Sequence, residues 1–256
     1  MFDPNPPLVG ETARPAALPK PPVRTRFAED RLMDAVVWCD ITPGAIISEA
    51  DIGQRFGLTR AVGRAALARL AHEGWATPQP RAGWQILPVT GSLVGDILTA
   101  RRLAEPAALA QTAIGPQQHQ RLQALAGLVA PLARQSDPSA RAMLAGFADD
   151  VDTILLAGLD LFTARHLRKL WAHSLRVARF LGVGTDTMHE SGLADLIAAV
   201  IAQDKAAIAD SRHALIDQQE AAFLQALLKN DTALGPGSGS QRHDSNNAAA
   251  HNGRPT

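Results

Sequence analysis

Arginine is the residue type in this sequence whose spacing most clearly suggests ligand binding, and five arginines fall in one short stretch. Between Gln54 and Arg81 there are five arginines and one acidic residue, Glu73, whereas the whole chain has 25 basic and 25 acidic residues and no formal net charge. A guanidinium can bind a guanine base or a phosphate through two hydrogen bonds. Because the chain as a whole has no general attraction to nucleic acid, DNA binding would have to rest on this local stretch.

The residues around these arginines predict two short helices joined by a tight turn. Ser48 and the acidic residues behind it are typical of a helix N-cap, and Gly57 is typical of a helix end. Thr59 can cap a second helix that runs to about residue 72.

The second helix carries polar residues at the end that a helix-turn-helix inserts into the major groove. Thr59 begins the helix, and Arg60 and Arg64 lie four residues apart, hence on one face. We predict that these three residues contact DNA, together with Arg55 near the end of the first helix.

A short β-hairpin follows, with strands predicted at residues 75–77 and 84–87. The loop between them carries Arg81 and Gly83, and we predict that both belong to a wing that contacts the DNA backbone or the minor groove. The alternative is a small α/β lobe whose arginines are merely solvated. The order of the elements favours DNA binding.

This stretch resembles the winged helix-turn-helix of GntR-type bacterial transcription regulators. The resemblance is carried by ITPG at 41–44, SEADI at 48–52, LTR at 58–60, RAAL at 64–67 and EG at 73–74. Ala61, Val62 and Ala65 depart from the family pattern, which has threonine, proline and glutamate there. The resemblance therefore implies the DNA-binding mode of the family but not its usual operator sequence.

The length of 256 residues and the 46% hydrophobic content allow two domains with real cores. One cysteine excludes an internal disulfide, and we find neither a membrane-span length of apolar residues nor a signal peptide. We therefore expect a cytoplasmic protein without membrane contact. The expected organisation is a proline-rich disordered arm at 1–25, a winged helix-turn-helix at 26–89, a helical domain at 93–230 and a disordered tail at 235–256.

The fold class is predicted to be mainly α, because residues 93–230 show only helical periodicity. Breaks at glycine and proline divide this region into about six helices, expected at 93–113, 117–135, 138–158, 161–181, 189–203 and 204–229. A bundle of this size can enclose a small ligand.

The helical region resembles the FCD ligand-sensing domain of the FadR subfamily of GntR regulators. The run RRLAEPAA at 101–108 carries most of the resemblance, and the segments 160–171 and 196–204 match more weakly. The resemblance implies effector binding and dimerisation by this domain. It also implies an effector that is a small organic acid or related metabolite, with repression relieved by the ligand.

Many FCD domains hold a divalent metal with one aspartate and three histidines, but this chain departs from that pattern. Phe147 stands at the aspartate position, and Val151 and Leu193 stand at two of the histidine positions. We therefore expect no metal and no other cofactor. A rearranged site that uses His173, His189 or His213 is the alternative.

Five polar residues are candidates for effector binding. Arg101 could clamp a carboxylate, although it could equally pair with Glu105 four residues later. The other candidates, each with solvent exposure or an ordinary structural role as the alternative, are Asp149, His173, Arg176 and His213.

No catalytic residues are predicted, because the sequence has no nucleophile–base pair, phosphate-binding glycine loop or CxxC spacing. The function that fits best is a sequence-specific transcriptional repressor whose operator affinity is modulated by a small molecule. It should be a homodimer on a palindromic double-stranded operator, since two winged helices double the base contacts. The alternatives are a metal-binding bundle or enzyme with a winged helix for protein interaction, and a constitutive regulator that senses nothing.

Overall fold

A computed structural model describes residues 23–135, 137–184 and 192–229, and the chain divides into two compact units. The first unit includes residues 23–36 and 40–88, and the second includes residues 37–39 and those from 89 onward. The first 22 residues of the expected arm, and the whole expected tail, lie outside the described residues. The first helix begins at Val23, within the stretch expected to be an arm.

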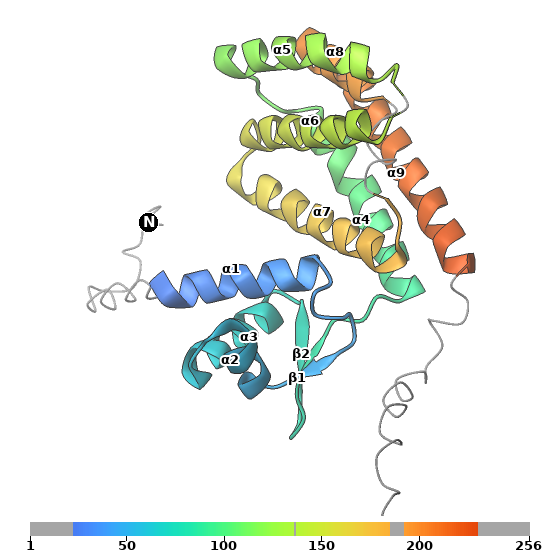
Figure 1. Cartoon of the computed structure of the whole chain (residues 1–256). Coiled ribbons are helices and arrows are strands. Elements are labelled where there is room, and N and C mark those ends of the chain that lie inside the picture. The colour runs from blue at the N-terminus through green and yellow to red at the C-terminus, as the bar shows by residue number, and fades with distance from the viewer. Residues whose placement is uncertain (1–22, 136, 185–191, 230–256) are drawn as a thin grey trace, which may run out of the picture. The chain divides into compact units, whose positions relative to one another are not determined.

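The first unit is a winged helix built from three helices and a small antiparallel sheet with the strand order β1-β3-β2 (Figure 1). Its elements are α1 (Val23–Val37), β1 (Ile46–Ile47), α2 (Glu49–Phe56), α3 (Arg60–His72), β2 (Ala76–Gln79) and β3 (Gly83–Ile86). The sequence predicts β2 and β3 but misses β1, because a two-residue strand has no detectable periodicity. Strand β1 exists through its pairing with β3, in the register Ile46–Gln85 and Ile47–Trp84.

The ends of α2 and α3 are set by the capping residues that the sequence indicates. Ser48 and Asp51 form a capping box, in which the Asp51 N–H donates to Ser48 Oγ (3.2 Å) and the Ser48 N–H donates to Asp51 Oδ2 (2.8 Å). Gly57 ends α2 in the left-handed conformation at φ 65°. The hydroxyl of Thr59 accepts from the Val62 N–H and caps α3.

Gly63 lies where α3 packs closely against α2. A Cβ at this position would lie 3.4 Å from the carbonyl oxygen of Glu49 and 3.6 Å from the Ile52 side chain. Glycine in a helix interior costs about 1 kcal/mol relative to alanine, and these distances are ordinary van der Waals contacts that an alanine could also make. Leu67 and Leu70 of α3 are buried beside this contact region.

In its described residues the second unit contains six helices, as the periodicity predicts, and no strand. They are α4 (Gly91–Leu109), α5 (Pro116–Leu132), α6 (Pro138–Ala157), α7 (Leu161–Leu181), α8 (Leu193–Ala202) and α9 (Lys205–Lys229). Helix α4 packs against α7 and α9, and α5 packs against α6 and α8. No helix in the described ranges is both long and apolar enough to cross a membrane.

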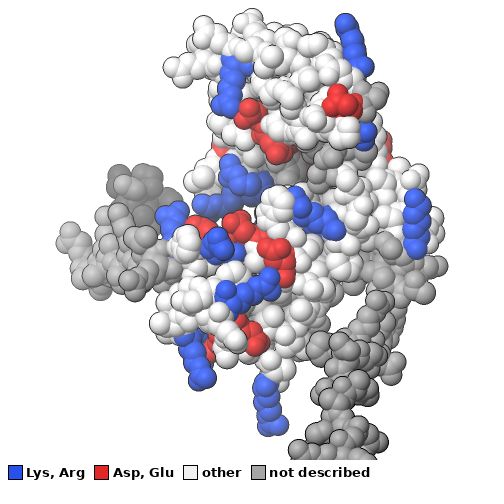
Figure 2. Space-filling model, in the orientation of Figure 1, with Lys and Arg blue, Asp and Glu red and all other residues white. Residues whose placement is uncertain are grey.

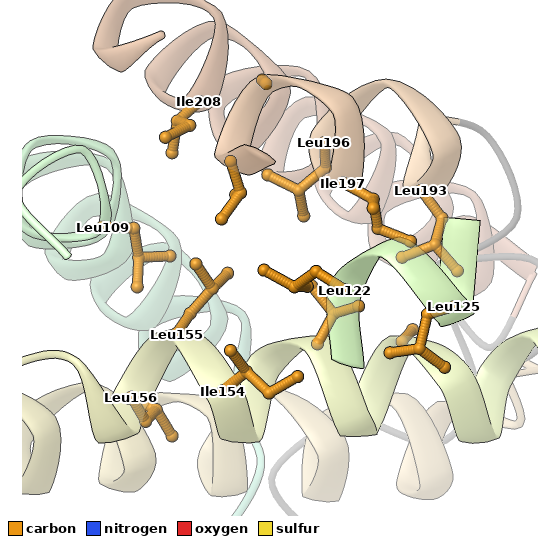
Figure 3. Packing of buried hydrophobic residues seen from close by; sticks show 14 of the residues in the cluster. Leu109, Leu122, Leu125, Ile154, Leu155, Leu156, Leu193, Leu196, Ile197 and Ile208 are labelled. Atoms are coloured by element: carbon orange, nitrogen blue, oxygen red, sulfur yellow. The ribbon is translucent and has the colours of Figure 1, made fainter. Parts of the chain in front are cut away.

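Two apolar clusters form the core of the second unit. One gathers around α5, α6 and α8, where Leu122, Leu155 and Ile197 converge (Figure 3). The other joins α4, α7 and α9 through residues such as Val177 and Ile216. Helices α4, α7 and α9 contribute to both clusters, and the buried residues between the two clusters include Arg101, Glu105 and Arg212.

Gly146 inside α6 and Gly158 at the C-terminal end of α6 give a matched test of the packing. A Cβ on Gly158 would lie 2.4 Å from the carbonyl oxygen of Ala113, whereas a Cβ on Gly146 would meet nothing within 4 Å. We expect Gly158→Ala to lower the free energy of unfolding by about 1–3 kcal/mol, through overpacking against backbone. Gly146→Ala should raise it by up to about 1 kcal/mol. Denaturant titrations of both variants measure these changes, and equal stabilities would contradict the packing described.

Candidate functional site

The N-terminal turn of α3 presents one arginine without an internal partner. Arg60 is exposed directly after the N-cap Thr59, and within the described chain its guanidinium makes no hydrogen bond or ion pair. The N-terminal N–H groups of a helix favour negatively charged groups such as phosphate. Arg60 is therefore positioned to bind a base edge or a phosphate placed against this turn.

Arg64, one turn further along α3, is held by a carboxylate on α2. Its Nε donates to Glu49 Oε1 at 2.6 Å and its Nη2 donates to Glu49 Oε2 at 3.1 Å. The Arg64 side chain is nevertheless 72% exposed. The hydrogen bonds from Arg64 lower the pKa of Glu49, with a smaller contribution from the charge of Arg60. The sequence gives no sign of this pair, because its members are fifteen positions apart.

The Arg55 side chain is hydrogen-bonded to the backbone of its own unit. Its Nη2 donates to the backbone carbonyl of Asp40 at 2.9 Å, and its guanidinium lies 5.7 Å from the centre of the Phe56 ring. The side chain is exposed near the end of α2. Contact between Arg55 and DNA stays a prediction, and such contact must accommodate the bond to Asp40.

The hairpin between β2 and β3 places Arg81 at its tip. The Ala82 N–H donates to the carbonyl of Gln79 at 3.1 Å, and Arg81 has φ 63°, a value at which glycine is the usual residue. Gly83 has φ 115°, and a Cβ there would lie 2.4 Å from the carbonyl oxygen of Ile47. Gly83 is thus required by the approach of β3 to β1, whereas Arg81 occupies a conformation unfavourable for a side chain and is exposed.

Figure 2 shows basic and acidic side chains mingled over the visible face of the molecule. This distribution agrees with the equal numbers of basic and acidic residues in the chain. On this face no large basic surface is seen, so attraction of nucleic acid to it would depend on individual arginines.

A buried ionic network of Arg101, Glu105, Asp152 and Arg212 lies inside the second unit. Arg101 and Glu105 form the pair that the sequence offered as an alternative, with Nε–Oε2 at 2.7 Å and Nη2–Oε1 at 3.2 Å. Arg212 donates to Asp152 Oδ1, and its Nη1 lies 3.7 Å from Glu105 Oε1. Neutral side chains complete the network, since Arg101 donates to Ser174 and Gln219 and the Trp171 indole donates to Glu105.

Two opposing effects act on the ionisation of Glu105. Burial alone would raise its pKa, but the charge and hydrogen bonds of Arg101, then Arg212 and the Trp171 indole, bring the pKa below its ordinary value. For Arg212, burial would lower the pKa, but Asp152 and Glu105 raise it. Both shifts favour the charged forms of Glu105 and Arg212.

The five predicted effector residues differ in their exposure. Asp149 on α6 and His213 on α9 are exposed, whereas Arg101, His173 and Arg176 are buried. Burial, with help from the charges of Arg176 and Lys169, lowers the pKa of His173 to about 4, so its ring is neutral at physiological pH. An effector role for these residues stays a prediction.

A small pocket that is partly open to solvent lies among α6, α8 and α9. Its polar lining comes from Asp152, Ser211 and Arg212, and its apolar lining includes Leu193, Leu196 and Leu215. Neither Asp152 nor Arg212 is among the residues predicted to bind an effector. Arg212 could have been noticed, because it stands between the buried Ile208 and Ile216 on one stripe of α9.

Two of the positions that the FCD resemblance equates with histidine ligands of a metal carry apolar side chains in this chain. Val151 and Leu193 are buried within the apolar cluster of α5, α6 and α8. In the part of the chain that the structure describes, no three His, Cys, Asp or Glu side chains gather closely enough to hold a metal. His189, suggested for a rearranged site, lies outside the described residues.

Comparison with known proteins connects the first unit to a family. Residues 24–86 match the family described as "Bacterial regulatory proteins, gntR family". Among solved structures, Escherichia coli McbR/YncC is similar with a TM-score of 0.60 and 19% identity, over 78% of this chain and 97% of that one. A GntR protein from Rhodococcus sp. RHA1 is similar with a TM-score of 0.55 and 19% identity, over 79% of this chain and 98% of that one. No curated protein matches the sequence.

These structural similarities cover both units. They show that the chain has the fold of these proteins, a winged helix-turn-helix followed by a helical domain, which confirms the predicted fold class. At 19% identity they carry no further information about ligands or target DNA.

The conformation of Arg81 allows stability and DNA binding to be separated. We expect Arg81→Gly to leave the free energy of unfolding unchanged or to raise it by about 1 kcal/mol, because glycine adopts positive φ without strain. The same change should weaken binding to duplex DNA and reduce the salt dependence by about one phosphate contact. Thermal melts and DNA titrations at several salt concentrations measure both effects. Unchanged DNA affinity would show that the wing makes no charge contact through Arg81.

Proposed function

We propose that the chain is a regulator of the gntR type, as the match of residues 24–86 to the model of that family suggests, and that it is a repressor of transcription that recognises a specific operator. Helix α3 would enter the major groove with Arg60 leading, while the Arg81 hairpin would contact the backbone or minor groove. The observation that carries this proposal is the exposed Arg60 guanidinium, which makes no hydrogen bond or ion pair in the described chain, at the capped N-terminus of α3.

In this proposal Arg64 also contacts DNA, after it exchanges its present partner Glu49 for a group on the DNA. Its ion pair with Glu49 is exposed, and such pairs contribute only about 0–1 kcal/mol. A DNA phosphate or a guanine edge can therefore replace Glu49 at little cost. Until then Glu49 keeps Arg64 extended between α2 and α3, in a geometry that already matches a two-oxygen acceptor.

We infer that the protein binds a palindromic operator as a homodimer formed through the second unit. Large apolar side chains are exposed on two helices that pack side by side: Leu103 on α4 is 78% exposed and Leu228 on α9 is 76% exposed. Burial of such side chains against a second copy would be favourable. Two copies would present two α3 helices to successive major grooves.

The second unit would serve as an FCD-type effector domain that acts in the cytoplasm, where bacterial DNA lies. A small organic-acid-like metabolite bound in it would shift the dimer toward an arrangement with lower operator affinity. The pocket among α6, α8 and α9 supports this proposal, because it combines apolar walls with a buried arginine.

The proposed function is tested by titrating the full chain against DNA from upstream of its own coding sequence, at fixed salt and with random duplex as competitor. The variant Arg60→Ala with Arg64→Ala removes the two predicted contacts. The matched control is Arg69→Ala, which also removes an exposed arginine from α3. Nine residues separate Arg69 from Arg60, so the two side chains leave the helix on opposite faces.

We expect the wild-type chain and Arg69→Ala to prefer the upstream DNA over random duplex by at least a hundredfold. The double variant should lose most of that preference, since each bidentate arginine–base contact is worth roughly 1–3 kcal/mol. Equal loss in Arg69→Ala and the double variant would exclude α3 as the reading helix. If the double variant still prefers the upstream DNA over random duplex, α3 is likewise excluded as the reading helix.

A further inference from the structure

Glu49 places a carboxylate beside the two arginines of α3 that would contact DNA. It is the first residue of α2, and both of its carboxylate oxygens accept hydrogen bonds from Arg64, from Nε at 2.6 Å and from Nη2 at 3.1 Å. The hydrogen bonds and charge of Arg64, with a smaller contribution from the charge of Arg60, lower the pKa of Glu49. Its carboxylate is therefore an anion at neutral pH, and the charges of both arginines act on it.

Arg64 is much more accessible than the carboxylate that holds it. The Arg64 side chain is 72% exposed, whereas that of Glu49 is 24% exposed. Arg60, one turn earlier on α3, is exposed as well. A group on DNA can thus reach both guanidinium groups, while Glu49 stays next to whatever group Arg64 binds.

The two kinds of acceptor on duplex DNA differ in charge. A phosphate is an anion, whereas the O6 and N7 atoms of a guanine edge belong to a neutral base. Breaking an exposed ion pair costs little by itself. A phosphate on Arg64, however, adds a second anion next to Glu49, and two like charges a few ångströms apart repel each other.

A guanine on Arg64 adds no charge beside Glu49. The released carboxylate still experiences the attraction of Arg60, whose charge already acts on it. It can also accept a hydrogen bond from the amino group of a cytosine in the major groove. Exchange of Glu49 for guanine is therefore more favourable than exchange of Glu49 for phosphate.

We propose that Glu49 is a specificity-determining residue, whose negative charge disfavours phosphates as partners of Arg64 and leaves Arg64 for guanine. Glu49 acts through Arg64, so it is a positioning residue. It weakens binding to DNA of any sequence and weakens it least where Arg64 meets a guanine. This inference rests on the proposed function, because it concerns which group on the DNA Arg64 takes.

The test is titration of the full chain with the upstream duplex and with a random duplex of equal length, at several salt concentrations. Glu49→Gln removes the charge but keeps the size of the side chain, and Glu49→Asp keeps the charge on a shorter side chain. Glu73→Gln is the matched control, because Glu73 is also paired with an arginine of α3, Arg69, in an exposed pair with Nε–Oε1 at 2.7 Å.

We expect Glu49→Gln to bind the random duplex about fivefold more tightly at about 0.1 M salt, with a salt dependence steeper by about one phosphate contact, because Arg64 becomes available to phosphates. Its affinity for the upstream duplex should rise by about twofold at most, since guanine already holds Arg64 there. The preference for the upstream duplex therefore falls. Glu49→Asp and Glu73→Gln should keep the wild-type preference to within about twofold, because the first retains the charge beside Arg64 and the second breaks only an exposed pair.

Combining Glu49→Gln with Arg64→Ala shows whether the carboxylate acts through Arg64. The gain in affinity for the random duplex should disappear in the double variant, as expected for two coupled residues. A gain of the same size without Arg64 would mean that Glu49 merely repels DNA as a whole, and the proposal would be wrong.

The proposal is also overturned when Glu49→Gln keeps the wild-type preference for the upstream duplex, or when Glu73→Gln lowers that preference equally. A wild-type chain that does not prefer the upstream duplex would contradict the proposed function and, with it, the role of Glu49. A wild-type preference that Glu49→Gln leaves unchanged would contradict only the role of Glu49.

Discussion

The fully buried carboxylate of Glu105 is the constraint on which the second unit depends. It accepts from Arg101 on its own helix and from Trp171 on α7, and it faces Arg212 on α9. A buried charge is tolerated only when it is paired and hydrogen-bonded, and loss of one partner from such a pair costs roughly 3–5 kcal/mol. The relative placement of α4, α7 and α9 therefore has little freedom around this group.

The network separates two kinds of packing within the same helices. On α4, Leu98 belongs to one apolar cluster and Leu109 to the other, with Arg101 and Glu105 between them. Apolar clusters accept small sliding movements, whereas hydrogen-bonded ion pairs have defined geometry. The first unit has the opposite character, because its ion pair between Arg64 and Glu49 is exposed and readily exchanged. In the second unit, buried ion pairs thus fix the packing of the helices. In the first unit, the exposed pair leaves Arg64 able to exchange Glu49 for another acceptor.

Most of the fold could be predicted because its signals are local. The caps Ser48 and Thr59, the stop at Gly57 and the breaks between the six later helices all act within a few residues. Strand β1 could not be predicted, since it is defined by pairing with β3 far along the chain.

The candidate sites were less predictable than the fold, because most of their residue pairs are far apart in the sequence. Arg101 and Glu105 are four residues apart on one helix, and their pairing was among the expectations. The partners Asp152 and Arg212 are separated by sixty positions, and only the three-dimensional packing of α6 and α9 makes them neighbours. The restraint of Arg64 by Glu49 likewise depends on how α2 meets α3.

Hydrogen–deuterium exchange of the full chain, alone and with its upstream DNA, tests the central claim most directly, because it locates the contact without any substitution. Recognition by α3 and the hairpin predicts slower exchange at residues 58–66 and 79–84 with the upstream duplex. A random duplex at the same salt should give much weaker protection. Unchanged exchange at both segments, or protection confined to the helices from α4 onward, would contradict the account.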